Sequence, residues 1–280
     1  MQLSVVIITF NEEANIGRTL ASVEPLVADG KGEIIVVDSG SSDRTVEIAK
    51  SFGAKVFVEE WKGYAAQKNS AIDKATGDWI LSLDADEEAD PELLREFTGQ
   101  PSQAPPSRMS SREWCLTMGG SREVLVGSPV GFYIRRKNYF LGRWILRGGF
   151  WPDPKLRLFR RGAGTFESRA VHEDIQVDGP TLAIPRGALI HHSYPTLSDY
   201  IEHMNRYSSL GAEMVVAKGK VRFSFINIVL RPLFTFIYNY FFRLGFLDGR
   251  EGLLLHLYHA VYVSWKYAKA WELSRNKLSS

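Results

Sequence analysis

The stretch Trp79-Ile80-Leu81-Ser82-Leu83-Asp84-Ala85-Asp86 decides the fold. Its first five residues form a short apolar run, which predicts a buried strand. Two carboxylates follow at the carboxyl end of that strand. In an open α/β sheet, ligands bind in the crevice outside the carboxyl ends of the strands, so acidic side chains there face a ligand. Short acidic clusters also occur in solvated loops, and the neighbouring sequence has to decide between these interpretations.

Strands and helices alternate on the amino-terminal side of this stretch. Leu3–Thr9 and Glu33–Asp38 are continuous Val- and Ile-rich runs, typical of strands that are covered on both faces. Between them, Glu12–Val27 carries apolar residues at helical spacing, which predicts a crossover helix. The further predicted elements are a helix from Ser42, a strand Lys55–Val58, a helix Tyr64–Ala75 and a short helix after Asp90-Pro91. This alternation predicts an α/β fold with a mostly parallel, doubly wound sheet.

The composition excludes several classes of protein. The formal net charge of +2 does not indicate a dedicated nucleic-acid binder, and we expect no nucleic-acid partner. The single cysteine, Cys115, excludes an intramolecular disulfide and a multi-cysteine zinc site, which favours a reducing compartment. Met1 leads straight into a predicted strand without the features of a secretory signal, so we expect a cytoplasmic protein.

The second half of the sequence has a different character. Gln100–Arg112 holds prolines among Ser and Gln, which predicts a loop. Aromatic and Arg residues interleave from Val130 to Phe159, and this pattern favours short strands. After His192 the pattern is helical again. We therefore predict two domains, an α/β domain over residues 1–195 and a helical, aromatic-rich region over residues 196–280.

The segment Phe223–Phe246 is rich in Phe, Tyr and Ile but is interrupted by Arg231-Pro232 and Arg243. No uninterrupted apolar run reaches the roughly 18 to 20 residues that a membrane-spanning helix needs. Its aromatic content with flanking Arg is typical of a segment that lies in the interface of a bilayer. The alternative is a buried pair of helices in a larger core.

Acidic and amide side chains follow three of the predicted strands. They are Asn11-Glu12 after the first strand, Asp38 after the second, and Asp84 with Asp86 after the fourth. If these strands lie side by side, the groups converge on one site. Carboxylates there suit a sugar nucleotide, because they accept hydrogen bonds from ribose and base while Asp86 holds a divalent ion against the diphosphate. Carboxylate ligands favour Mg²⁺ or Mn²⁺.

The sequence resembles the inverting glycosyltransferases with a GT-A fold. SVVIITFNEE at Ser4–Glu13 is similar to their opening strand and loop, VVDSGSSDRT at Val36–Thr45 to their base-binding loop, and LSLDADE at Leu81–Glu87 to their metal motif. Within that family the chain is most similar to bacterial lipopolysaccharide core glycosyltransferases. That likeness rests on three further stretches, GYAAQKNSAI at Gly63–Ile72, KLRLFRR at Lys155–Arg161 and VHED at Val171–Asp174.

The resemblance implies roles for individual residues in the donor site. Asp38 would bind the base, Asp84 the ribose and Asp86 the metal ion. Lys68 would reach the nucleotide, although a solvated helix face is its structural alternative. The residues that would line the nucleotide pocket are Thr9, Asn11 and Glu12, with Ser39 and Asp43 as further contacts. Asp43 has the alternative role of capping the helix that follows it.

The resemblance also implies a general base that takes the proton of the acceptor hydroxyl. Glu173 is the candidate, and Asp174 is the close alternative. Arg157 and Arg160 are candidates for binding the leaving diphosphate or an anionic acceptor, with a solvated strand face as the alternative. His191-His192 has two interpretations, a structural role and a metal ligand.

Together, residues and resemblance predict a bacterial enzyme that moves a sugar from a nucleotide-diphosphate sugar donor to a lipid-linked glycan acceptor of the cell envelope, with lipopolysaccharide inner core as the leading acceptor. The alternatives are transfer to a polyprenyl phosphate and a nucleotide-binding scaffold without turnover. We expect a peripheral protein on the inner face of the cytoplasmic membrane. Residues 101–129 match no part of the family pattern, and this segment normally shapes the acceptor side.

Overall fold

The chain divides into two compact units, each described here by itself. The structure is a computed structural model and describes residues 2–98, 129–167, 175–219 and 221–276. We call the first unit the sheet unit; it comprises Met1–Arg136, Pro154–Arg169 and Glu173–His191. The second, the helical unit, comprises Lys137–Asp153, Ala170–His172 and His192–Ser280. The helical unit thus takes in residues 137–153 in addition to the carboxyl-terminal region. The domain boundary at residue 195 stays a prediction.

The sheet unit is built on a seven-stranded sheet with the order β12-β6-β9-β4-β1-β2-β3. Four of its strands are parallel neighbours in the middle and at one edge, namely β1 (Leu3–Thr9), β2 (Gly32–Asp38), β3 (Lys55–Val58) and β4 (Trp79–Asp84). The remaining strands are β6 (Gly131–Ile134), β9 (Lys155–Arg160) and β12 (Thr181–Ala183). β9 runs antiparallel to both β4 and β6. The predicted α/β fold with a mostly parallel sheet is therefore confirmed.

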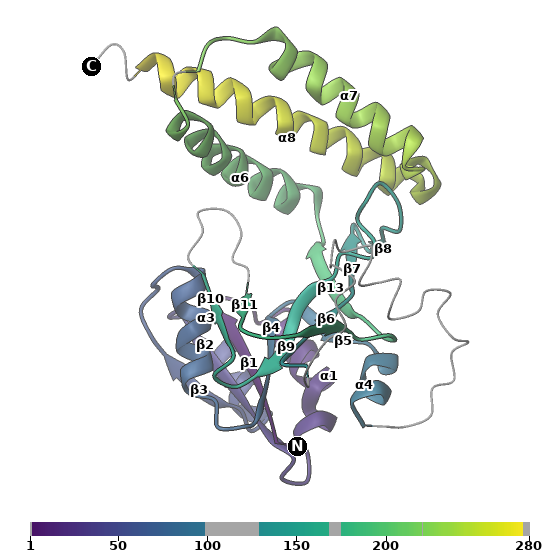
Figure 1. Cartoon of the computed structure of the whole chain (residues 1–280). Coiled ribbons are helices and arrows are strands. Elements are labelled where there is room, and N and C mark those ends of the chain that lie inside the picture. Colours follow the sequence, from purple (N-terminus) through teal and green to yellow (C-terminus); the bar gives the residue numbers. More distant parts are fainter. Residues whose placement is uncertain (1, 99–128, 168–174, 220, 277–280) are drawn as a thin grey trace. The chain divides into compact units, whose positions relative to one another are not determined.

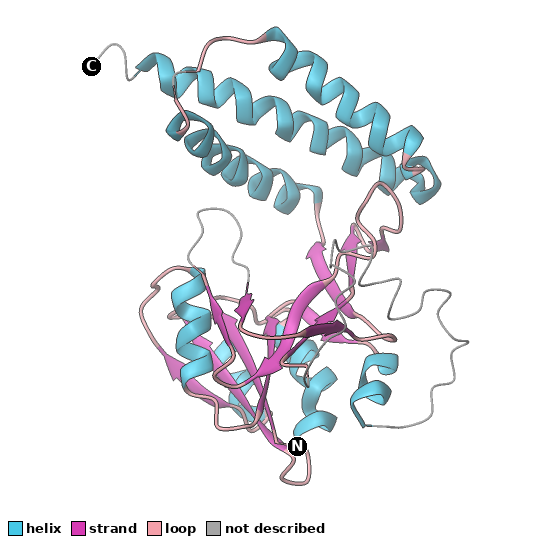
Figure 2. Cartoon of the chain, viewed as in Figure 1, coloured by secondary structure: helices cyan, strands magenta, loops and turns pink. Residues whose placement is uncertain are grey.

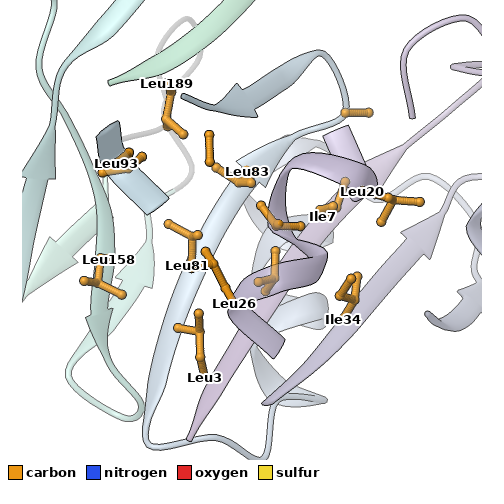
Figure 3. Close-up of a cluster of buried hydrophobic side chains, with 14 of the residues drawn as sticks. Leu3, Ile7, Leu20, Leu26, Ile34, Leu81, Leu83, Leu93, Leu158 and Leu189 are labelled. Carbon is orange, nitrogen blue, oxygen red and sulfur yellow. The ribbon is translucent and has the colours of Figure 1, made fainter. Parts of the chain in front are cut away.

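Two apolar layers cover the faces of this sheet, because successive side chains of a strand point to opposite faces. Leu3, Val5 and Ile7 belong to one buried cluster, whereas Val6 belongs to the other. Figure 3 shows Leu20 and Leu26 of α1 among the side chains of the first cluster. The helices of this unit are α1 (Ile16–Val27), α2 (Thr45–Ser51), α3 (Tyr64–Asp73) and α4 (Pro91–Thr98).

Short strands complete the sheet unit and lead into the helical unit. β10 (Gly164–Phe166) pairs with β11 (Ile175–Val177), and β5 (Glu87–Ala89) pairs with the beginning of β13 (Leu189–Tyr194). In the helical unit, β7 (Arg136–Phe140) pairs with β8 (Arg143–Trp144). The short strands predicted between Val130 and Phe159 are thereby confirmed. β7 and β13 carry the chain from one unit to the other.

The helical unit consists mainly of three long helical segments that lie side by side, as Figures 1 and 2 show. Phe140, Ile145, Tyr200 and Leu255 form a buried cluster within this unit. α6 begins with a capping box, in which Thr196 and Asp199 bond each other's backbone N–H. The segments are α6 (Leu197–Ala217); the run η1 (Ile226–Leu230), α7 (Arg231–Ile237) and η2 (Tyr238–Phe242); and η3 (Gly245–Asp248) followed by α8 (Gly249–Asn276).

Arg231-Pro232 does not interrupt the helical run, although the sequence marks an interruption there. Proline lacks an N–H, so the carbonyl of Ile228, four residues earlier, loses its usual partner. The hydroxyl of Ser264 on α8 donates a hydrogen bond of 2.7 Å to that carbonyl. A π-helical turn, η1, lies directly before the proline. In the part of the chain that the structure describes, no helix has the length and apolar character needed to cross a membrane.

Candidate active site

Three neighbouring strands bring the predicted acidic residues to one edge of the sheet. β1 lies between β2 and β4. Thr9 is in register with Asp38 on one side, and Ile8 is in register with Asp84 on the other. Parallel strands end at the same edge, so the ends of β1, β2 and β4 adjoin there. The convergence that the sequence predicted is a direct result of this strand order.

The loop after β2 is held by the carboxylate of Asp38, which is fully buried. Its Oδ1 accepts hydrogen bonds from the backbone N–H groups of Gly40 and Ser41, at 2.9 and 2.8 Å, and its Oδ2 accepts one from the Ser41 hydroxyl. The backbone of Gly40 is left-handed, with φ of 89°, which favours glycine. Asp38 therefore shapes the loop, and its contact with a nucleotide base stays a prediction.

The loops after β1 and β2 are joined through Asn11. Its backbone N–H donates to the Ser41 hydroxyl at 2.8 Å, and its side-chain oxygen accepts from the N–H of Ser42 at 2.9 Å. Asn11 adopts a left-handed conformation with φ of 52°, which Asn tolerates better than most residues. These contacts fix the two loops against each other at the ends of β1 and β2, a place we call the mouth of the site.

Two hydroxyl groups at this mouth are buried without a hydrogen-bond partner among the described residues. They belong to Thr9 and Ser39. The two residues are adjacent, because the backbone N–H of Ser39 donates to the carbonyl of Thr9 at 2.9 Å. A buried hydroxyl without a partner costs about 1–3 kcal/mol, so such groups call for an explanation. A bound ligand with polar groups supplies one. Both residues were predicted to contact the nucleotide.

Asp43 bonds the first residue of α2, although Arg44 and not Asp43 is the N-cap residue of that helix. Its Oδ1 accepts hydrogen bonds from the backbone and the hydroxyl of Thr45, and its Oδ2 accepts one from the N–H of Glu13 at 3.1 Å. The hydroxyl oxygen of Thr45 in turn accepts from the N–H of Glu12 at 2.8 Å. This chain of contacts positions Glu12 at the site.

Four carboxylates lie near one another at this edge, those of Glu12, Asp43, Asp84 and Asp86, and their charges affect the pKa of Glu12. Burial raises the pKa of Glu12, the hydrogen bond of 2.7 Å from Asn15 partly offsets this, and the negative charges of Asp86, Asp43 and Asp84 raise it further. Mutual repulsion of this kind is relieved when a cation binds among the carboxylates. The donor set is made of oxygen atoms, which hard divalent cations prefer.

Asp84 is clamped between two cations. Its Oδ1 lies 2.9 Å from Nζ of Lys68, and its Oδ2 lies 2.5 Å from Nη2 of Arg157. Burial raises the pKa of Asp84, but the charges of Arg157 and Lys68 outweigh it and hold the pKa well below its usual range. Lys68 is buried, so the solvated helix face that the sequence left open for it is wrong.

Arg157 is buried as well, with only 5% of its surface exposed. The solvated strand face that the sequence left open for it is therefore wrong. The same Nη2 atom that bonds Asp84 lies 2.7 Å from Oε1 of Glu87, and Nη1 of Arg136 lies 3.3 Å from that oxygen. In the structure, the guanidinium of Arg157 thus contacts carboxylates of its own chain. A contact of Arg157 with substrate stays a prediction.

Sequence reasoning missed Glu87, which lies at the centre of this network. Its side chain is fully buried. Besides the two arginines, it accepts a hydrogen bond of 3.1 Å from the backbone N–H of Asp84 through Oε2. The available signal was weak: Glu87 directly follows Asp86 in an acidic run that continues with Glu88, and nothing in such a run distinguishes a buried member from an exposed one.

Asp86 lies next to His191. Nε2 of His191 is 3.3 Å from Oδ2 of Asp86. β13 carries the histidine to this position, because His191 is in register with Glu87 of β5. Burial raises the pKa of Asp86, but the His191 ring outweighs it and lowers the pKa below its usual value. Of the two interpretations of His191, this position agrees with a role at the site, beside the residue predicted to bind metal.

The residues present fit a divalent ion that is held mainly by a substrate. Among the described residues, no group of three His, Cys, Asp or Glu side chains is arranged to hold a metal. Mg²⁺ commonly binds through one or two carboxylates together with substrate phosphates, so a complete protein cage is not required. The partly exposed carboxylate of Asp86, beside the crowded acids of this edge, meets that requirement. Glu173 and Asp174 lie outside the described residues.

Known proteins are similar in sequence to this chain over nearly its full length. The profile of Glycosyl transferase family 2 matches residues 4–103. A lipopolysaccharide core biosynthesis glycosyltransferase, LpsC, of Rhizobium meliloti is 30% identical over 278 residues, which are 97% of this chain and 93% of that protein. An uncharacterized glycosyltransferase of Rickettsia typhi is 30% identical over 286 residues, which are 100% of this chain and 91% of that protein.

A solved structure shares the fold. The mannosyltransferase PcManGT of Pyrobaculum calidifontis, in complex with GDP-Man and Mn²⁺, has a TM-score of 0.50 at 15% identity, over 99% of this chain and 74% of that chain. This likeness confirms the predicted GT-A fold. The match to the Rhizobium relative covers the sheet unit, with its convergent strand ends, and the helical unit alike. The protein is therefore a glycosyltransferase and belongs to glycosyl transferase family 2.

Proposed function

We propose that this glycosyltransferase moves a sugar, with inversion and with a divalent ion, from a nucleotide-diphosphate sugar to a lipid-linked glycan of the cell envelope. Lipopolysaccharide inner core is the leading acceptor. The observation that carries the proposal is the edge of the sheet where β1, β2 and β4 end. Two buried hydroxyl groups without a partner among the described residues and several carboxylates lie at or just after these strand ends. The Rhizobium relative, a lipopolysaccharide core biosynthesis glycosyltransferase, supports this acceptor.

In this proposal the nucleoside occupies the mouth between the loops after β1 and β2. The hydroxyls of Thr9 and Ser39 exchange hydrogen bonds with it, which satisfies two groups that have no partner among the described residues. Asn11 and Asp38 hold the two loops in place around it. Asp84 contacts the ribose, and its position is set in advance by the ion pairs with Lys68 and Arg157.

The diphosphate lies beside Asp86, with Glu12 and His191 next to it. Asp86 would hold Mg²⁺ or Mn²⁺ there, and the ion would supply positive charge against the negative charge that develops on the leaving diphosphate. The acceptor hydroxyl attacks the anomeric carbon on the side opposite the diphosphate, and Glu173 takes its proton. Asp174 is the alternative base. Attack from the opposite side inverts the configuration of that carbon.

The helical unit supports a peripheral position on the membrane, on its inner face where nucleotide sugars are made available. Phe242 is 74% exposed, and it belongs to a series of exposed apolar side chains. Those on η1, α7 and η2 are Ile226, Val229, Leu230, Leu233, Phe234, Ile237, Tyr238, Phe241 and Phe242. The buried helix pair that the sequence left open is wrong for these residues. An exposed apolar face of this extent is typical of a membrane or protein contact.

A transfer assay tests the proposed function. Purified full-length protein is incubated with radiolabelled sugar nucleotides and bacterial membrane extracts, with and without Mn²⁺. We expect metal-dependent transfer into a lipid-linked product, and we expect Asp86→Asn to abolish it. Asp29→Asn is the matched control, because Asp29 is exposed, lies after α1 and has φ of 57°, which Asn tolerates. If no sugar is transferred from any donor and no donor is hydrolysed, the proposal is contradicted.

The same assay separates the alternative acceptor. Transfer to a polyprenyl phosphate gives a lipid phosphate that carries one sugar, and mild acid releases that sugar as the free monosaccharide. Transfer to lipopolysaccharide inner core gives a sugar that is part of an oligosaccharide, so mild acid does not release it as the free monosaccharide. A product of the first kind alone contradicts the inner-core acceptor but leaves the donor site as proposed.

A further inference from the structure

Four arginine residues lie on segments that meet at one corner of the helical unit, where the loop after β8 contacts the turn between η2 and α8. Figure 1 shows the backbone of these segments. The four residues are Arg143, Arg147, Arg243 and Arg250, and we call them the arginine corner. All four are exposed. The donor site described above uses none of them, and they belong to the other compact unit of the chain.

The corner is a built structure, held by the buried carboxylate of Asp248. Its Oδ2 accepts a hydrogen bond of 2.7 Å from the N–H of Arg147, and its Oδ1 accepts one of 3.3 Å from the N–H of Leu146. The N–H of Gly148 donates to the carbonyl of Arg243 at 3.1 Å. The guanidinium of Arg243 lies directly over Gly149, where a Cβ atom would be only 2.2 Å from Nη1.

The positive charge of the corner is only partly compensated, because its four arginines lie beside two carboxylates, those of Asp248 and Glu251. Nη1 of Arg143 is 3.8 Å from Oε2 of Glu251, which is a long ion pair. Both oxygens of Asp248 are occupied by backbone N–H groups and are buried. Within the described residues, Arg147, Arg243 and Arg250 have no carboxylate within ion-pair distance. The corner therefore presents several guanidinium groups to an outside partner.

Apolar side chains are exposed at the same corner. They are Leu146, Phe242, Leu244, Phe246 and Leu247, each at least 40% exposed. Leu244 also has a left-handed backbone with φ of 59°, which is costly for a leucine. Exposure of the apolar Leu244 side chain to water does not offset the cost of this backbone conformation. Leu244 is well placed at the boundary between water and an apolar phase, with arginines beside it.

We propose that the arginine corner binds the phosphate groups of anionic phospholipids, while the neighbouring apolar side chains enter the bilayer interface. The proposal rests on the membrane association proposed above and adds the class of lipid that is recognised. Charge complementarity supports it, since arginine presents a planar set of donors that matches phosphate oxygens. Each arginine near an anionic surface increases binding about five-fold. A soluble anion accounts for the arginines but not for Phe242 and Leu244 among them.

Vesicle flotation tests this inference with the full-length protein. The vesicles are made of phosphatidylcholine alone or of phosphatidylcholine with phosphatidylglycerol. We expect wild-type protein to bind the anionic vesicles more strongly than the neutral ones, and to release them as salt is raised. Arg147→Gln/Arg250→Gln lowers binding to the anionic vesicles by about twenty-five-fold, and binding to neutral vesicles is unchanged. Arg147→Lys/Arg250→Lys retains most of the binding.

The controls separate failure of this inference from failure of membrane association. Lys31→Gln/Lys50→Gln removes two exposed cations of the sheet unit and should bind as wild type. Phe242→Ser should weaken binding to both kinds of vesicle. Equal wild-type binding to both kinds overturns the anionic selectivity and leaves membrane association intact, whereas no binding to either overturns both. Arginine-dependent self-association without vesicles also overturns the inference, because a second copy would then occupy the corner.

Discussion

Arg157 on β9 and Asp84 on β4 form an ion pair between antiparallel neighbours, with 2.5 Å between Nη2 and Oδ2. The same nitrogen reaches the fully buried Glu87 at 2.7 Å. One guanidinium thus joins the last residue of β4 to the first residue of β5. Arg157 thereby positions Asp84 at the proposed donor site, and only 5% of its own surface is exposed.

Arg157→Met is expected to destabilise the protein strongly. It leaves the carboxylate of Glu87 buried with a reduced set of partners, and removal of one member of a buried ion pair costs about 3–5 kcal/mol. The free energy of unfolding, measured by urea denaturation, reports the loss. Arg160→Met is the control on the same strand: Arg160 is exposed and packs over the ring of Trp79 at 5.6 Å, a contact of about 0.5–1 kcal/mol. Equal losses in the two variants contradict the role of Arg157.

Thr9→Val is expected to weaken donor binding without destabilising the fold. The Thr9 hydroxyl is buried with no partner in the described part of the chain, so replacing it with a methyl group removes a desolvation cost. If the donor uses this hydroxyl, loss of one hydrogen bond weakens its binding about five-fold. Calorimetric titration with nucleoside diphosphate measures the affinity, and thermal denaturation measures the stability.

Thr19→Val is the matched control for stability. The hydroxyl of Thr19 is also buried, but it donates a hydrogen bond of 2.6 Å to the carbonyl of Ala85. Its loss leaves that carbonyl without this donor, so the variant should be less stable by about 1 kcal/mol. If Thr9→Val loses as much stability as Thr19→Val, the hydroxyl of Thr9 has a partner within the protein and the prediction is wrong.

The presence of the parallel strands was accessible from the sequence, and the surroundings of Arg157 were not. Continuous Val and Ile runs such as Leu3–Thr9 are recognisable because burial on both faces excludes polar residues. Alternation along KLRLFRR places Arg157 opposite its leucine neighbours, which indicates a polar face. The antiparallel insertion of β9 between β4 and β6 turns that face toward Asp84 and Glu87. Such a pairing depends on tertiary contacts that local pattern does not encode.

The arginine corner illustrates the same limit. Arg143 and Arg147 lie far from Arg243 and Arg250 in the sequence, and tertiary contacts such as those of Asp248 and Gly148 bring the two segments together. By contrast, the aromatic content of Phe223–Phe246 with its flanking Arg predicted an interfacial segment from sequence alone. That prediction included Arg243 but not the three other arginines of the corner.

The stability of the helical unit should fall in mild acid because of His256. Burial is the main cause that lowers the pKa of this histidine to about 4, His259 and Arg243 lower it further, and Asp248 opposes them. The unfolded chain binds the proton near pH 6.5, so stability is complete above that pH and is lost as the pH falls toward 4. At about pH 5 the expected loss is about 2 kcal/mol.

His256→Leu isolates this effect. Both ring nitrogens of His256 lack a partner among the described residues, so replacing the histidine with leucine breaks no hydrogen bond there. The difference in the free energy of unfolding between wild type and variant, measured by urea denaturation at about pH 7.5 and about pH 5, cancels the titration of His259. We expect the wild type to lose about 2 kcal/mol more than the variant on acidification. Parallel losses contradict the assignment.

Glu173→Gln is expected to separate turnover from donor binding. A general base contributes about 10²- to 10⁴-fold to the rate, and its loss does not remove contacts with the nucleotide. Turnover should therefore fall by that factor, while the affinity for the donor, measured by calorimetric titration with Mn²⁺, stays within about two-fold. Asp174→Asn decides between the neighbouring carboxylates of VHED. If it lowers turnover by the larger factor and Glu173→Gln does not, Asp174 is the base, because a single carboxylate has to accept the proton of the acceptor hydroxyl.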